Sequence, residues 1–363
     1  MIHFVIGTRA QLFKMTPIML ECEKRGLEWR WVYAAQHKET FQQTLDFFGL
    51  PKADYTIVDW DTEAKTVSKM LVWTWKMTVA LLKSKKILDG YTGKNHIVLT
   101  HGDTTTTVFG ALMGKLTGTK VMHVESGLRS FNILNPFPEE LNRLATFRLS
   151  DYYACPGDWA VENVKKYKGI KINTHENTQM DVLKFGLQNI EKASIKLPKE
   201  KYVVLSSHRF ENLYNKDRFK KIIEAAELAA KTFKVIIPQH PVTRNQITKQ
   251  GYRKRLESNK NIILMPRLEY ENYLKAIVGS EFVMTDGGGN QEELYHLGKP
   301  TLILRDKTER QEGIGKTALI SKLDMDVIAD FIKNYKKYKQ PPVKETLSPT
   351  NIIVDAITKF GKK

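Results

Sequence analysis

The stretch that decides the fold of this chain is Thr285-Asp286-Gly287-Gly288-Gly289-Asn290-Gln291-Glu292-Glu293. It follows an apolar run, 282–284, that is typical of a buried strand, and it leads into residues 291–297, which favour a helix. Glycines at a strand-to-helix turn leave backbone N–H groups exposed at a helix N-terminus, where an anion binds well. The pattern indicates a nucleotide or sugar-phosphate ligand, with Gly287 and Gly288 admitting the phosphate and Glu293 near a sugar hydroxyl. A glycine-rich loop without a ligand is the alternative.

Outward from this run, short apolar segments alternate with longer amphipathic segments along the whole chain. Such alternation predicts parallel sheets covered by helices on both faces. The expected strands are 3–6, 31–34, 96–99, 120–124 and 152–154, and then 202–205, 234–237, 262–265, 282–284 and 301–304. The expected helices include 12–24, 104–116, 217–232 and 270–278.

The two series of strands predict an α/β protein made of two doubly wound, Rossmann-like domains that face a central cleft. We expect the first domain over residues 1–172 and the second over 173–345, because Gly169, Asn173 and Asn177 accumulate near the join. A second break is expected at Gln340-Pro341-Pro342, after which a closing helix, within 346–363, returns to the first domain.

Composition excludes several classes of protein. The 363 residues are 42% hydrophobic and 27% charged, as in an ordinary globular protein, and no apolar run is long enough to span a membrane. Cys22 and Cys155 have no metal-ligand spacing, which suits the reducing cytoplasm, and we expect no metal site. The net charge of +17 comes from dispersed lysines, so a solvated surface is favoured over a nucleic-acid site.

One segment, 70–82, is unusually apolar and contains Trp73 and Trp75. A helix that is apolar on most faces is buried or lies in an interface. We interpret this segment as core or as a homodimer contact.

Polar residues recur where the expected strands end, which is where ligands bind in doubly wound folds. In the first domain Asp103, Glu125 and Glu139 suit general acid/base chemistry, because neighbouring carboxylates shift each other's pKa values. Each has a structural alternative: Asp103 as a helix N-cap and Glu139 as a favourable charge in a first helical turn.

Three arginines, Arg9, Arg143 and Arg310, are suited to holding phosphates or to balancing these carboxylates, with a surface ion pair as the alternative for Arg143.

Two nucleotide-binding motifs are incomplete or absent in this sequence. Gly315-Lys316-Thr317 resembles the end of a phosphate loop, but Arg310 stands where the first glycine is required. No GxGxxG follows the first strand, so we expect neither a nicotinamide nor any other cofactor.

Together these segments resemble the non-hydrolysing UDP-N-acetylglucosamine 2-epimerases, bacterial enzymes of the glycosyltransferase-B fold. The matching residues are Gly7-Thr8-Arg9 with Lys14, Gln36-His37, His101-Gly102-Asp103-Thr104-Thr105-Thr106, His123-Val124-Glu125-Ser126-Gly127-Leu128-Arg129, Pro136-Phe137-Pro138-Glu139-Glu140, Asn142-Arg143, Asn177-Thr178 with Asp181, His208-Arg209 with Glu211-Asn212, Pro238 and His240, the glycine run to Glu293, and Arg305-Asp306 with Thr308-Glu309-Arg310. The resemblance covers residues 2 to about 312.

The resemblance implies inversion at C2 of the sugar through loss and return of UDP, without a redox cofactor, in surface polysaccharide synthesis. It implies that Asp103, Glu125 and Glu139 are the acid/base groups, with His208 near the sugar. The diphosphate and sugar would be held by Arg9, Lys14, Arg143, His240, Gly287, Gly288, Gly289 and Arg310. Glu293 would take the ribose hydroxyls, Tyr273 would lie beside uracil, and Gln36 and His37 would belong to a regulatory site.

The sequence departs from the family pattern at several positions. Ala10-Gln11 stands for Pro-Glu, Gly287 for a serine, Asn290 for an apolar residue and Glu176 for a glycine. Other UDP-2-acetamido sugars, acidic or diacetamido, are therefore alternative substrates. A UDP-sugar glycosyltransferase of the same fold is the alternative from another class of enzyme.

Overall fold

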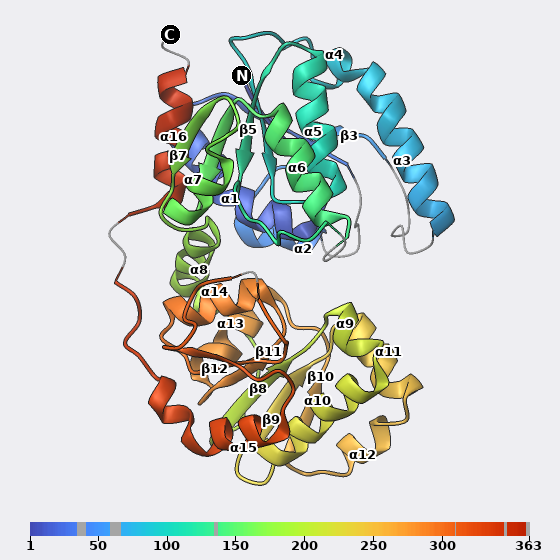
Figure 1. Ribbon diagram of the computed structural model, residues 1–363, viewed down its shortest axis with the longest axis vertical. Helices are drawn as coiled ribbons and strands as arrows, with labels where there is room; N and C mark the ends of the chain where they lie inside the picture. Colours follow the sequence, from blue (N-terminus) through green and yellow to red (C-terminus); the bar gives the residue numbers. More distant parts are fainter. Residues whose placement is uncertain (35–40, 59–66, 134–136, 309, 345–346, 361–363) are drawn as a thin grey trace. The chain divides into compact units, whose positions relative to one another are not determined.

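The computed structural model describes residues 1–34, 41–58, 67–133, 137–308, 310–344 and 347–360. The chain forms two compact units, Met1–Val182 with Thr346–Lys363, and Leu183–Glu345. Figure 1 shows that helix α16 (Pro349–Phe360), drawn in red, lies in the first unit, where it packs on α1 (Arg9–Lys24). An ion pair between Arg25 and Asp355 joins these two segments.

The first unit contains a parallel sheet whose strand order, over the described residues, is β3-β2-β1-β4-β5-β6-β7. Its strands are β1 (Ile2–Ile6), β2 (Trp29–Tyr33), β3 (Tyr55–Thr56), β4 (Ile97–His101), β5 (Lys120–Val124), β6 (Tyr152–Cys155) and β7 (Ile170–Asn173). The other helices that begin in this unit are α2 (Phe41–Phe48), α3 (Val67–Leu82), α4 (Ser84–Ile87), α5 (Thr105–Leu116), α6 (Glu139–Leu149), α7 (Asp158–Val164) and α8 (Gln179–Gln188).

The second unit contains a parallel sheet of order β10-β9-β8-β11-β12-β13 within the part of the chain described. Its strands are β8 (Tyr202–Ser206), β9 (Lys234–Pro238), β10 (Ile262–Met265), β11 (Val283–Thr285), β12 (Thr301–Ile303) and β13 (Ala318–Ile320). Its α-helices are α9 (Phe210–Leu213), α10 (Lys216–Ala229), α11 (Pro241–Lys249), α12 (Arg253–Glu257), α13 (Tyr270–Gly279), α14 (Gly288–His296) and α15 (Met325–Asn334), with 3-10 turns at Ile190–Lys192 and Tyr335–Tyr338.

Alternate residues of each strand feed two cores, one on each face of the sheet. In the second unit Val203 and Leu205 enter one buried cluster, whereas Tyr202 and Val204 enter the other. Because both faces are covered, the strands are continuous apolar runs rather than alternating ones. This confirms the predicted α/β class with two doubly wound sheets.

The predicted strands are all present, with shifts of one or two residues, but three edge strands escaped prediction. β3, β7 and β13 are short, and β7 lies within residues 168–178, where the domain join was expected. The glycine run also differs from expectation. Helix α14 begins at Gly288, so two of the three glycines lie inside the first turn of the helix instead of before it.

Helix α3 is only partly a core element. Trp73 and Met77 are fully buried on one side, whereas Leu71, Trp75 and Leu82 are exposed on the opposite side. The prediction that this segment is apolar on most faces is therefore confirmed, but only one face packs in the core of this chain.

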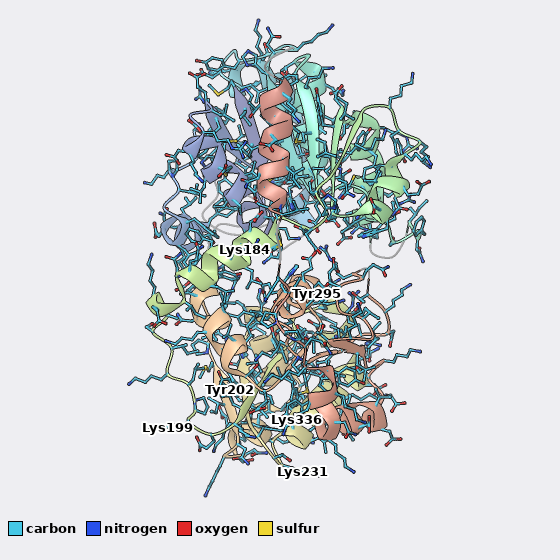
Figure 2. The ribbon with its side chains drawn as sticks, turned by 90° about the vertical axis from the view of Figure 1, so that its left-hand side faces the viewer. Lys184, Lys199, Tyr202, Lys231, Tyr295 and Lys336 are labelled. Carbon is cyan, nitrogen blue, oxygen red and sulfur yellow. The ribbon has the colours of Figure 1, made fainter. Side chains whose placement is uncertain are left out.

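Neither thiol is positioned for chemistry. Cys22 and Cys155 are free and fully buried, and burial raises the pKa of each to about 12. The basic surface matches the dispersed pattern of the sequence, since Figure 2 shows Lys199, Lys231 and Lys336 at separate places on the second unit. Over the described residues, no helix is long and apolar enough to cross a membrane.

Candidate active site

The candidate site of the first unit lies at the carboxyl end of the first sheet, where β1 and β4 are neighbours. The sheet order reverses between these two strands, and the helices that follow them leave a crevice in which ligands bind in doubly wound folds. The turn Gly7-Thr8 follows β1, and the turn Gly102-Asp103 follows β4. A side chain at Gly7 would collide with Thr106, which shows how closely the turn after β1 approaches the start of α5.

Glu125 is held in a buried cluster at the end of β5. The Nζ atom of Lys14 lies 2.9 Å from Oε1 and 3.0 Å from Oε2 of Glu125, and His101 Nε2 lies 3.2 Å from Oε2. All three side chains are at most 10% exposed. Lys14, which the sequence assigned to substrate binding, is thus the counter-ion of an acid/base candidate.

Asp103 belongs to a second network of charges. Arg143 forms ion pairs with Asp103 and with Glu140, whose carboxylate is fully buried and also pairs with Arg129. Desolvation by burial raises the pKa of the Glu140 carboxyl group. The hydrogen bonds that this group accepts from the Ser130 N–H, from Arg129 and from Arg143 together outweigh desolvation, so the pKa is lowered. Arg143 therefore balances carboxylates in this structure, one of the two roles considered from the sequence.

The carboxyl group of Glu139 is positioned differently. Glu139 is the first residue of α6, and its Oε2 atom is buried without a hydrogen-bond partner among the described residues. A buried carboxylate oxygen is normally paired, so an unpaired one needs a proton or a donor from elsewhere. Glu139 is therefore available to exchange a proton or accept a hydrogen bond from a ligand.

The N-cap of α5 is Thr104, so the alternative role of Asp103 as N-cap is wrong.

A buried imidazole supports the turn that carries Asp103. His123 Nε2 lies 2.7 Å from the carbonyl oxygen of Gly102, and its Nδ1 lies 3.0 Å from Ser126 Oγ. Burial lowers the pKa of His123 to about 4, so the ring is neutral at neutral pH. These contacts fit a tautomer whose Nε2–H donates to Gly102 and whose Nδ1 accepts from Ser126.

The candidate site of the second unit lies at the N-terminus of α14. Gly287 is the N-cap residue with φ −85°, and its N–H donates to Thr285 Oγ1 at 3.1 Å. A side chain at Gly289 would meet no atom within 4 Å, so the space over this turn is open. The exposed N–H groups of the first helical turn are suited to a diphosphate.

Asp286, which has no assigned role in the predictions from sequence, is the centre of the candidate site of the second unit. Its buried carboxylate accepts hydrogen bonds from Ser207 Oγ at 2.6 Å, from the N–H groups of His208 and Arg209 at 3.0 and 3.1 Å, and from Asn212 Nδ2 at 2.9 Å. These bonds link the turn after β11 to the turn after β8. The two strands are neighbours where the order of the second sheet reverses.

The structure brings two of the predicted histidines together. The rings of His208 and His240 are 5.8 Å apart between centroids, and His240 is the N-cap residue of α11. Desolvation lowers the pKa of His208, while the carboxylate of Asp286, 3.6 Å from His208 Nδ1, raises it. The net direction is downward, which favours a neutral imidazole.

The remaining predicted residues of the second unit already have protein partners. Arg310 pairs with the buried carboxylate of Glu292, and Glu293 accepts a hydrogen bond from Tyr270 at 2.8 Å. Tyr273 packs against the core of the sheet with a buried hydroxyl. In the first unit, Arg9 donates to Thr44 at 3.1 Å. Gln36 and His37 lie outside the described residues.

The strand-end rule that found Asp103 and Glu125 would also have found Asp286, since Asp286 directly follows β11. His101 and Glu140 were quoted as parts of motifs but received no role. Sequence offered no signal for the ion pair of Glu140 with Arg129.

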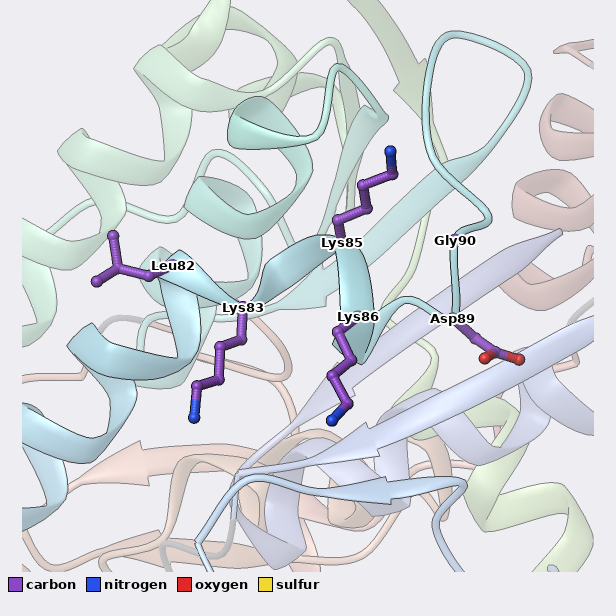
Figure 3. Close-up of a pocket in the computed structure, with 6 residues that line it drawn as sticks. All are labelled: Leu82, Lys83, Lys85, Lys86, Asp89 and Gly90. Carbon is purple, nitrogen blue, oxygen red and sulfur yellow. The ribbon is translucent and has the colours of Figure 1, made fainter.

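The first unit also has a surface hollow that is separate from the candidate active site. Leu82, Lys83, Lys85, Lys86, Asp89 and Gly90 line it, and Figure 3 shows Lys85 pointing away from Lys83 and Lys86. It lies at the amino ends of the strands, because Asp89 pairs with Arg30 near the start of β2. Its lysines do not converge, and it lies at the opposite edge of the sheet from Asp103 and Glu125.

A family profile described as UDP-N-acetylglucosamine 2-epimerase matches residues 20–348 of the chain. The chain belongs to the UDP-N-acetylglucosamine 2-epimerase family.

Individual members of the family agree with this assignment. The chain is 33% identical to the UDP-N-acetylglucosamine 2-epimerase of Bacillus subtilis over 316 residues, which cover 85% of this chain and 80% of the relative. It is 31% identical to the enzyme of the same name from Neisseria meningitidis, with 92% and 91% covered. The crystal structure of a Neisseria meningitidis UDP-GlcNAc 2-epimerase bound to UDP-GlcNAc superposes with a TM-score of 0.80, at 27% identity and 99% coverage of both chains.

Gly287 replaces a serine that is usual in this family, and its geometry predicts the effect of restoring that serine. The negative φ is accessible to any residue, so backbone strain is excluded, and an added Cβ would lie 3.1 Å from His208 Cε1. Side chains rather than backbone form this contact, so they can adjust. We expect Gly287→Ser to tighten UDP binding by about tenfold or less, because the hydroxyl adds a hydrogen bond to a charged group.

Titration calorimetry with UDP measures this effect, and Gly289→Ser is the matched control, since the space there is open. Weaker UDP binding together with a lower melting temperature in Gly287→Ser would contradict the expectation.

Proposed function

We propose that this chain interconverts UDP-N-acetylglucosamine and UDP-N-acetylmannosamine by elimination and re-addition of UDP, in the synthesis of bacterial surface polysaccharides. The main support is the arrangement of carboxylates in the first unit. Lys14 pairs with Glu125, His101 Nε2 lies 3.2 Å from Glu125, Arg143 pairs with Asp103, and one buried oxygen of Glu139 has no hydrogen-bond partner among the described residues. Members of the same family carry the corresponding name.

The proposed reaction requires two proton transfers at C2. A carboxylate takes the C2 proton while the bond between C1 and the phosphate oxygen breaks, which leaves a double bond between C1 and C2. A proton then adds to C2 from the other face, and UDP returns to C1. We assign the transfers to Asp103, Glu125 and Glu139, because positioned carboxylates are suited to general acid/base catalysis. Glu125 forms an ion pair with Lys14, and Asp103 forms one with Arg143.

The second unit is suited to retaining UDP between the two steps. The N-terminus of α14 offers N–H groups to the diphosphate, and Glu293 lies further along the same helix, where it accepts a hydrogen bond from Tyr270 of α13. We assign the diphosphate to Gly288, Gly289, Arg310 and His240, and the ribose to Glu293. Arg310 and Glu293 would then exchange part of their present hydrogen bonds for the ligand.

Measurement of the reaction in D2O tests this proposal. Proton NMR should show UDP-N-acetylmannosamine formed from UDP-N-acetylglucosamine with deuterium at C2, because the proton is lost to solvent and regained. Product without label at C2 would exclude the elimination mechanism. Sugar transfer to an acceptor, with C2 still protonated, would identify a glycosyltransferase instead.

We further propose that the chain forms a homodimer through the exposed face of α3 and that it acts in the cytoplasm, where its free cysteines stay reduced. Leu71, Trp75 and Leu82 lie within a narrow arc of the helix, opposite the buried Trp73 and Met77. Trp75 is 63% and Leu82 is 87% exposed. An apolar stripe of this kind on a surface helix marks an association site, and two copies of one stripe are self-complementary across a twofold axis.

Charge placed on this stripe should separate the protomers. We expect Trp75→Glu to shift the chain from dimer to monomer in light scattering coupled to gel filtration, with the melting temperature of the monomer little changed. Ile170→Glu is the control, since Ile170 is a 53% exposed apolar residue on β7 in the same unit. A dimer that survives Trp75→Glu would exclude this face.

A further inference from the structure

Gln11 stands where the family usually has glutamate, and its side chain is 2% exposed. The amide lies between the turn after β1 and the turn after β4, the pair of strands at which the order of the first sheet reverses. Every polar atom of the amide has a partner in one of these two turns or at the start of α5.

One end of the amide belongs to the local structure of α1. Oε1 accepts hydrogen bonds from the N–H groups of Gly7 at 2.9 Å and Thr8 at 3.2 Å, and the Thr8 hydroxyl accepts from the Gln11 N–H at 3.3 Å. This is a capping box, in which glutamate serves as well as glutamine. Helix capping alone therefore explains Oε1 but does not require an amide.

The other end of the amide reaches across the crevice. Nε2 lies 2.8 Å from the carbonyl oxygen of His101, 2.9 Å from Thr104 Oγ1 and 3.0 Å from Thr107 Oγ1. The carbonyl also accepts a hydrogen bond from Thr107 Oγ1 at 2.6 Å, so the amide is its second donor. An ionised carboxylate in place of the amide has no proton to donate and would face the carbonyl oxygen. His101 faces Glu125, and Asp103 is two residues further along the same turn.

We propose that Gln11 is a positioning residue for the reaction: its amide fixes the turn that carries Arg9 against the turn that carries His101 and Asp103. The inference rests on the proposed epimerase activity for its kinetic consequences and on the hydrogen bonds alone for its structural ones. Gln11 itself sits below the turns and is not a catalytic residue.

Two substitutions separate capping from bridging. Gln11→Glu keeps the capping box but places a carboxylate beside the His101 carbonyl, whereas Gln11→Leu removes both functions at similar volume. We expect kcat to fall about 10- to 100-fold in Gln11→Leu, with a smaller change in UDP affinity, because hydrogen bonds that orient acid/base groups act on the chemical step. Gln246→Leu is the control, since Gln246 is a buried glutamine on α11 that accepts from Gln250.

The pH profile of Gln11→Glu gives the decisive readout. A protonated carboxyl can donate to the His101 carbonyl as the amide does, and an ionised one cannot. The ratio of variant to wild-type kcat should therefore be close to one at low pH and fall as pH rises and the carboxyl loses its proton. A ratio that is independent of pH would overturn the bridging role, as would wild-type kcat in Gln11→Leu.

Hydrogen exchange keeps the inference testable apart from the activity. In Gln11→Leu, amide exchange of the peptide that contains Gly7 and Thr8 and of the peptide around Asp103 should both accelerate. In Gln11→Glu only the Asp103 peptide should accelerate, and only above the pH at which the carboxyl ionises. If the wild-type protein incorporates no deuterium at C2 of the sugar in D2O, the proposed function is wrong. The amide exchange rates then decide the role of Gln11 on their own. Unchanged rates in both variants would overturn it.

Discussion

Replacing Glu125 by glutamine should lower kcat by roughly 10²–10⁴-fold, the usual loss when a positioned proton-transfer group is removed. The carboxylate is the only described anion in a buried cluster with Lys14 and His101. Glutamine has nearly the same shape and can still accept a hydrogen bond from Lys14, but it neither takes nor returns a proton. Turnover followed by NMR measures the effect. Asp103→Asn and Glu139→Gln should give losses in the same range.

Binding of UDP separates a chemical role for Glu125 from a binding role. Calorimetry should show UDP affinity nearly unchanged in Glu125→Gln, because the residue addresses the sugar in our assignment. Glu162→Gln is the matched control, since Glu162 pairs with Lys165 at 3.3 Å on the exposed surface, where ion pairs contribute little. Strongly weakened UDP binding with intact turnover would reassign Glu125 as a binding group.

Asp286→Asn should affect both binding and stability. The carboxylate accepts four hydrogen bonds, so an amide NH2 group in place of one oxygen faces donors such as the Arg209 N–H and Asn212 Nδ2. Each buried donor left without an acceptor costs about 1–3 kcal/mol in the free energy of unfolding. We also expect UDP to bind about 10–100-fold more weakly, as is typical when a group that orients binding residues is changed.

Denaturant unfolding and UDP calorimetry measure these two effects of Asp286→Asn. Asp330→Asn provides the comparison, because Asp330 is exposed on α15 and accepts only from Asn334 at 2.8 Å. An Asp286→Asn protein with wild-type stability and wild-type UDP affinity would show that the turns after β8 and β11 do not depend on this carboxylate.

Strands inside the sheets were predictable, because they are buried apolar runs with polar boundaries; β5 has the expected bounds. Among the described edge strands, β10 was also predicted, because all four of its residues are apolar. The short edge strands β3, β7 and β13 were not predictable, since one side of each has no neighbour and selection for apolar residues is weak. β7 reads Ile-Lys-Ile-Asn, and all four residues are partly or fully exposed. Only pairing with β6 makes this segment a strand.

In the site, the topological rule located individual residues but not their partners. Lys14 and Glu125 are 111 positions apart, so only the folded sheet shows that they form an ion pair. The choice between Glu139 and Glu140 illustrates the same limit. Both begin α6, but they point in different directions around the helix. Glu140 pairs with Arg129 and Arg143, whereas Glu139 Oε2 has no hydrogen-bond partner in the part of the chain that the structure describes.

The two buried cysteines give the native chain a practical property. Maleimides and other thiol reagents attack thiolates, and burial together with a pKa of about 12 leaves Cys22 and Cys155 almost entirely protonated and inaccessible. A cysteine introduced on the surface, for example at Lys199 or Lys115, would therefore be the single site of attachment for a fluorophore or spin label, with no need to remove the native thiols first.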